Sequence, residues 1–227
     1  MAEEAAGVVQ VKMRIHRVAA FAAVLALLPP LVMRAQQRGA PPPSAPQAPG
    51  TPLQPGGGRG RGSIQVMTLT SSAWPDGGII PDKYTQAGED ISPPLAWSNV
   101  PAGTASFVLI VHDPDAVVGA GTEDTLHWML WNLPATVAAL HEHAPSMAQL
   151  PDGTRQISAT GPYYRGPGAA SAGPAHHYVF ELYALDTMLD VPAVGASPAQ
   201  TRAAIVTAMA AHVRGKAVCV GLFKRHE

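Results

Sequence analysis

The stretch ASFVLIVHDPDAVVGAGTEDTLHWMLWNLP, residues 105–134, holds two apolar runs of strand length on either side of a glycine- and aspartate-rich break. The first run, residues 105–113, is almost continuously apolar, which predicts a strand buried on both faces. Asp113-Pro114-Asp115 follows it, and because proline cannot continue a central strand, we expect the chain to leave the sheet there. Two strands therefore carry aspartates and a histidine to one end of a β-rich domain. They could form an acid/base pair, a metal site or an anion pocket.

Short apolar runs separated by turn formers continue through the rest of the chain and favour a mostly β fold. Residues 63–71, SIQVMTLTS, alternate at period two, and residues 176–186, HHYVFELYALD, are rich in aromatic and branched side chains. A last strand is expected over Lys216–Phe223. The pattern predicts an antiparallel β-sandwich with a helix at its edge.

That helix has clear end signals. Ser197 is an expected N-cap, Pro198 fits the first helical position, and Gln200 completes a capping box. Gly215 is the expected stop signal. Between them, Ile205 and Met209 mark a modest apolar stripe.

Three regions follow from composition. Residues 1–38 read as a signal peptide or N-terminal anchor with its start at Met13, because a basic segment precedes an apolar run of export-signal length. Residues 39–62 are rich in proline and glycine and are expected to form a disordered linker. Residues 63–227 are the expected folded domain. The protein is therefore predicted to be exported, periplasmic or secreted, with anchoring by an uncleaved N-terminal segment as the alternative.

Charge and cysteine content exclude several classes. The formal net charge is −1 and 14% of residues are charged, so nucleic acid is not an expected partner. The single cysteine, Cys219, lies in an apolar run and is expected to be a buried thiol. No serine occupies a G-x-S-x-G elbow, so a covalent hydrolase lacks its nucleophile, and a general-base hydrolase is a less favoured alternative.

Strand parity sorts the polar residues by face. It places His127 and Trp128 on opposite faces of their strand. It also places His176 and Tyr178 on the same face of a second strand, and His177 on the other face. The glycines around Pro167 could present backbone N–H groups to an anion. Two histidines and an aspartate could instead hold a metal, but no H-x-x-x-H or H-E-x-x-H spacing occurs, and the pair His141 and His143 is a weak signal.

Several motifs in this order resemble the phosphatidylethanolamine-binding protein family, especially its bacterial branch of Raf kinase inhibitor-like proteins. They are IIPDKYTQAGEDISPPLAWSNVPAGTASFVLIVHDPDA, then HWMLWNLP, then YYRGPG and GPAHHYVFELYALD, and the resemblance spans residues 67–223. It implies a Greek-key β-sandwich with a small pocket for phosphate, a phosphoethanolamine head group or a carboxylate. The implied ligand-binding residues are Asp113, His127, Gly166, Pro167, His176 and Tyr178, with Asp115 and Trp128 in supporting positions.

The sequence departs from the family pattern at two places. Val117 stands where the motif has proline, and Gly168-Ala169-Ala170 replaces a Cys-Pro-Pro, which puts ligand selectivity in question. The expected function is binding of a small anion or phospholipid head group, without a cofactor or metal, together with a possible protein partner; the oligomeric state stays open. The alternative is a secreted inhibitor of a protease or other enzyme that acts through its surface.

Overall fold

The computed structural model describes residues 64–119 and 121–227. The expected signal segment and the expected linker lie outside these residues. Within them, no helix has the length and apolar character needed to cross a membrane.

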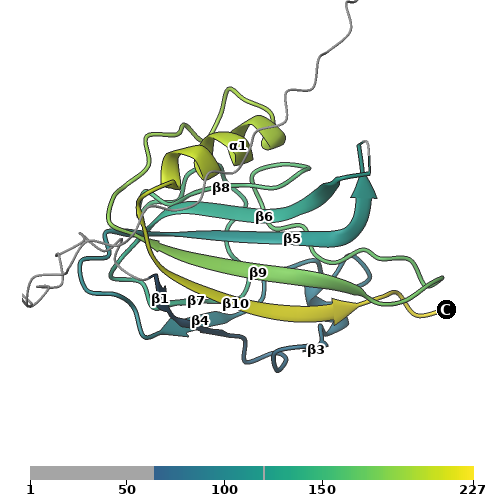
Figure 1. The fold of residues 1–227 in the computed structure, drawn as a ribbon. Coiled ribbons are helices and arrows are strands. Elements are labelled where there is room, and N and C mark those ends of the chain that lie inside the picture. Colours follow the sequence, from purple (N-terminus) through teal and green to yellow (C-terminus); the bar gives the residue numbers. More distant parts are fainter. Residues whose placement is uncertain (1–63, 120) are drawn as a thin grey trace, which may run out of the picture. The chain divides into compact units, whose positions relative to one another are not determined.

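Two sheets build the domain (Figure 1). The larger sheet has the strand order β1-β10-β9-β5-β6-β8, with β3 also paired to β10. Its strands are β1 (Gln65–Val66), β3 (Gly78–Ile79), β5 (Ser106–Val118), β6 (Glu123–Pro134), β8 (Arg155–Ile157), β9 (His176–Leu185) and β10 (Val213–Phe223). The smaller sheet has the order β2-β4-β7, formed by β2 (Thr68–Thr70), β4 (Leu95–Ser98) and β7 (Ala139–Leu140).

The long strands pair antiparallel, as expected, and only the two-residue strands β1 and β3 run parallel to β10. Strands β5, β6, β8 and β9 lie in the spatial order β9-β5-β6-β8, which is the Greek-key arrangement. The single alternating segment 63–71 becomes two strands in different sheets, because the chain crosses from β1 to β2 at Met67. The mostly β fold predicted from the sequence is therefore present.

Strand β5 is covered on both faces, which explains its continuous apolar run. Phe107, Leu109 and Val111 belong to the core between the two sheets. Val108 and Ile110 point to the opposite face, where they pack in a second core with the helix residues Ile205 and Met209. The strand also continues beyond Asp113: pairing with β9 stops at His112, while pairing with β6 resumes at Val118 to form a protruding hairpin.

Helix α1 (Pro198–Met209) lies over the β6 and β8 side of the large sheet (Figure 1). Its N-terminus has the predicted capping box, since the Ser197 side chain accepts from the Gln200 N–H and the Gln200 side chain accepts from the Ser197 N–H. Its C-terminus differs from the prediction, because the helix ends at Met209 and Ala211 adopts φ +68°.

Gly215 is consequently not a helix stop but part of β10. A Cβ atom at this position would lie 2.7 Å from Met67 Sδ and 2.8 Å from Pro101 Cγ. The glycine is required by close packing against the β1 side of the sheet, a reason that a local helix-stop rule does not include.

Candidate functional site

Asp113 is held at the end of the buried part of β5. The residue is 2% exposed. Its Oδ1 accepts the backbone N–H groups of Asp115 at 2.9 Å and Ala116 at 3.0 Å, which is the Asx-type turn favoured by an Asp-Pro sequence. Its Oδ2 lies 2.9 Å from Nδ1 of His176. The carboxylate thus anchors both its own loop and a histidine from the neighbouring strand.

His176 and Tyr178 share one face of β9, as period-two geometry predicts. Tyr178 is almost fully buried, and its hydroxyl oxygen accepts the N–H groups of Gly168 at 3.2 Å and Ala169 at 3.1 Å. Burial, reinforced by the nearby Asp113 carboxylate, raises the pKa of Tyr178 to about 12. The phenol therefore stays protonated at physiological pH and positions the loop that follows Pro167.

His127 reaches the same place because β6 carries a β-bulge. The register changes from Val111 opposite Trp128 to His112 opposite Leu126, which leaves His127 as the extra residue. Its ring stacks edge-on against Tyr178, with 5.1 Å between ring centroids. Tyr178 and Trp128 belong to the same core cluster, so the predicted separation of His127 and Trp128 onto opposite faces is wrong.

The protonation of His127 follows from its surroundings. Nδ1 lies 2.7 Å from the carbonyl oxygen of Arg165, which assigns the ring proton to this nitrogen. Burial lowers the pKa of His127 below its usual range, and the Arg165 carbonyl and the Asp113 carboxylate only partly offset that effect. The ring is neutral at pH 7, and Nε2 then accepts a hydrogen bond or takes up a proton beside an anion.

These side chains surround a cavity of about 310 Å³. Asp113, His127, His176 and Tyr178, all expected from the sequence, line it together. Gly168, expected from the sequence as a backbone donor, is also in the wall. The remaining walls come from residues that the sequence reasoning did not single out or treated only as a departure from the family pattern: Gln86, Ala116, Thr125, Arg165, Ala169 and Ala170.

Arg165 is the most important residue that sequence reasoning missed. Its backbone N–H donates to the His127 carbonyl at 3.0 Å, and its guanidinium donates to Oε1 of Gln86 at 3.1 Å. Arginine keeps its positive charge at all physiological pH values. The signal was present, because Arg165 directly precedes the Gly-Pro dipeptide and Gln86 lies in the TQAGED motif.

Gly166 and Pro167 do not line the cavity. The Gly166 N–H donates to Oδ1 of Asp90 at 2.6 Å, so the expected nest of free backbone donors is not formed there. Gly166 is nevertheless required, since a Cβ would come within 2.4 Å of the Tyr84 carbonyl oxygen. The Pro167 carbonyl accepts the backbone N–H of Gln86 at 2.9 Å. Both residues therefore position the cavity wall through contacts outside the cavity.

The two residues expected in supporting positions also lie outside the cavity. Asp115 accepts both the backbone N–H of His177 at 2.7 Å and its Nδ1 at 2.8 Å, which ties the loop after β5 to the start of β9. The hydrogen bonds from His177 lower the pKa of Asp115. Trp128 is fully buried and donates to Oε1 of Gln156 at 2.8 Å.

One of the two departures from the family motif lies at this site. Gly168, Ala169 and Ala170, which stand where the family motif has Cys-Pro-Pro, form part of the cavity wall. The side chain of Val117 lies outside the part of the molecule that is described.

Among the described residues, no group of three His, Cys, Asp or Glu side chains has metal-binding geometry. Cys219 is buried, which raises the pKa of its thiol to about 11.

The chemistry of the site suits an anion. Arg165 supplies a permanent positive charge, and His127 and His176 supply ring nitrogens that donate when protonated. Asp113 is already engaged by two N–H groups and His176, which spreads its negative charge over fixed partners. Among the described residues that line the cavity, none is a serine or cysteine.

Comparison with known proteins agrees with this architecture. The family model described as phosphatidylethanolamine-binding protein matches residues 70–224. A UPF0098 protein from Methanothermobacter thermautotrophicus is 41% identical over 161 residues, which cover 70% of this chain and 99% of the relative. A candidate lipoprotein, LppC, from Mycobacterium tuberculosis is 32% identical over 164 residues, covering 71% of this chain and 74% of LppC.

The crystal structure of a phosphatidylethanolamine-binding protein homolog, CT736, from Chlamydia trachomatis is similar to the fold. It superposes with a TM-score of 0.59 at 33% identity and covers 71% of this chain and 99% of CT736. The likeness therefore extends over nearly the whole of that smaller protein.

Proposed function

The chain belongs to the phosphatidylethanolamine-binding protein family, and from that premise we propose that its β-sandwich binds a small anionic group at the cavity between β5, β6 and β9. The ligand classes are phosphate, a phosphoethanolamine head group or a carboxylate. The observation that carries the proposal is the convergence of Arg165, His127 and His176 on one cavity of about 310 Å³. That size suits a head group and is too small to enclose a whole phospholipid.

The buried Asp113 does not argue against an anion, because three of its roughly four acceptor positions are already used. It holds the His176 ring from the Nδ1 side, so that Nε2 is the ring nitrogen left for a ligand. The pair therefore fixes the orientation of the His176 ring at the cavity wall.

Export of the protein is part of the same proposal. A basic segment followed by an apolar run begins at Met13, and the relative LppC is named a candidate lipoprotein. A head-group pocket on an exported protein would meet phospholipids or their soluble fragments outside the cytoplasm. Fractionation of cells that express the full chain tests this directly, and recovery of the protein in the cytoplasmic fraction alone would contradict it.

Isothermal titration of the full chain tests the binding proposal. Inorganic phosphate and phosphoethanolamine should give saturable heats, while ethanolamine, which lacks the anion, should give none. His127→Ala should weaken binding, because it removes a cavity-lining imidazole that stacks on Tyr178. The absence of saturable binding for phosphate, phosphoethanolamine and acetate alike would reject the anion pocket. An inhibitory activity that survives His127→Ala would instead point to a surface mechanism.

A further inference from the structure

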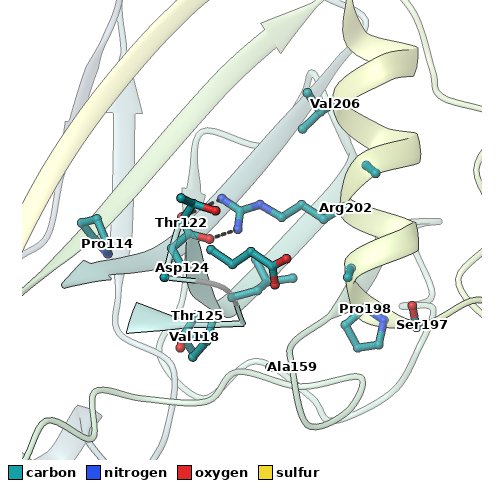
Figure 2. Close-up of a pocket in the computed structure, with 15 residues that line it drawn as sticks. Pro114, Val118, Thr122, Asp124, Thr125, Ala159, Ser197, Pro198, Arg202 and Val206 are labelled. Atoms are coloured by element: carbon teal, nitrogen blue, oxygen red, sulfur yellow. Dashed lines mark hydrogen bonds and ion pairs between the residues drawn. The ribbon is translucent and has the colours of Figure 1, made fainter. Parts of the chain in front are cut away.

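A second cavity, larger than the anion site, lies between helix α1 and the protruding β5–β6 hairpin (Figure 2). Its volume is about 840 Å³. The hairpin is a wall common to both cavities, since Thr125 lines each of them while Asp113 faces the small one and Pro114 the large one. The anion-binding function makes no use of this groove.

The groove is apolar where a surface helix is normally polar. Thr201, Ile205 and Met209 are the buried residues of α1. The groove side of the helix carries Ala199, Ala203 and Val206, and Arg202 is the only charged residue of the helix. A helix with apolar residues on both sides is typical of one that is covered on both sides.

The opposite wall repeats this character. Val118, at the end of β5, is 40% exposed, and Val206 on the helix is 50% exposed. Pro114, Leu126, Ala159 and Pro198 complete the apolar lining. A contiguous group of exposed apolar side chains of this kind on a small domain usually marks an interaction site.

The charges of the groove favour a basic occupant. Arg202 reaches across from α1 and pairs with Asp124 on β6, with one contact of 3.0 Å (Figure 2). Nδ1 of His112 lies 2.5 Å from the same carboxylate. Arg202 is therefore already neutralised. Glu123 also lines the groove, and no cation pairs with it within residues 64–119 and 121–227. At the start of α1, the capping box already uses the N–H groups of Ser197 and Gln200.

We propose that this groove docks an extended peptide segment of a partner protein in which a lysine or arginine is flanked by apolar side chains. The basic residue pairs with Glu123, and the apolar neighbours contact Val118, Ala203 and Val206. The helix from Pro198 to Val206 is about 12 Å long at 1.5 Å per residue, which an extended peptide of about four residues spans. The Glu123 carboxylate disfavours an anionic membrane surface as the occupant.

Two matched probe peptides test the proposal: acetyl-Leu-Arg-Leu-Pro-amide and acetyl-Leu-Glu-Leu-Pro-amide. Each is titrated into the ¹⁵N-labelled full chain, and amide shifts report both affinity and location. The arginine probe should shift residues 121–126 and 198–206 and bind at least about threefold more tightly than the glutamate probe, as expected for one exposed ion pair. Glu123→Lys should reverse this preference.

A pair of valine variants tests the apolar contact. Val206→Gln should weaken both probes by about threefold or more, whereas Val218→Gln, at a site on β10 that is 45% exposed, should leave both unchanged. Phosphate titration should give the same affinity in all three variants, which separates this proposal from the anion pocket. Equal binding of the two probes, shifts outside the groove, or no saturable shifts up to about 1 mM peptide would overturn the proposal.

Discussion

Two adjacent histidines, His176 and His177, offer a sharp test of the anion pocket. Both pair through Nδ1 with an aspartate, at 2.9 Å from Asp113 and 2.8 Å from Asp115, respectively. They differ in the strand face that they occupy. His176 lines the cavity and its side chain is 27% exposed, whereas the His177 side chain is 57% exposed and points away from it. The same substitution one residue apart should therefore have very different effects.

His176→Ala should weaken phosphate binding by about 10- to 100-fold. A hydrogen bond to a charged group contributes about 1.5–3 kcal/mol, and each 1.4 kcal/mol is a factor of ten in affinity. The variant also leaves the charge of the Asp113 carboxylate uncovered beside the anion, which acts in the same direction. His177→Ala should change affinity by less than about twofold, because Asp115 keeps the backbone N–H of residue 177 as a partner.

The assay is isothermal titration with inorganic phosphate at low ionic strength, at a pH where the wild type binds. Thermal unfolding of each variant shows whether the fold is intact. If His177→Ala reduced affinity as much as His176→Ala in folded protein, the assignment of the two residues to opposite faces of the site would be refuted. Unchanged affinity in His176→Ala would refute the role of the imidazole as a donor.

Four further predictions concern the residues around this histidine. Asp113→Ala should lower the free energy of unfolding by about 1–3 kcal/mol in chemical denaturation, because two part-buried N–H groups lose their acceptor, whereas Asp113→Asn, which keeps an acceptor oxygen, should cost clearly less. Burial lowers the pKa of His127, so the free protein should lose stability as pH falls below about 6.5, the ordinary value at which the unfolded chain takes up the proton. Sulfate does not titrate in this range and should stabilise the imidazolium, so it should bind more tightly as pH falls. Titrations in two buffers can measure the proton uptake that accompanies binding. A sulfate affinity that does not change with pH would exclude His127 as a donor. Tyr178 should ionise only near pH 12, so ultraviolet titration of wild type minus Tyr178→Phe should show no tyrosinate step at pH 10.

Strand positions and faces were predictable where local pattern and final environment agree. The continuous apolar run of β5 correctly predicted burial on both faces, because one face meets the smaller sheet and the other meets α1. Alternation in β9 correctly placed His176 with Tyr178. The capping box at Ser197 was also recognisable, since all of its atoms lie within four residues.

Parity failed in β6 because it assumes an unbroken ladder. The bulge at His127 depends on how β6 pairs with β5, and it turns the histidine toward Tyr178. The helix stop failed for a similar reason, since Gly215 is selected by the close approach of Met67 and Pro101 from distant parts of the chain. The sequence alone does not distinguish a glycine that ends a helix from a glycine that is required by close packing.

The sequence by itself determined the strand-rich pattern, the ordered family motifs and the histidine that faces the cavity, because each depends on residues a few positions apart. Only the tertiary structure decided which donors remain for a ligand. The Gly166 N–H donates to Asp90, and the Tyr178 hydroxyl accepts the N–H groups of Gly168 and Ala169. Arg165 lines the cavity and remains as a donor. Every buried polar group must find a partner, and the competition for those partners is settled between segments that the sequence keeps far apart.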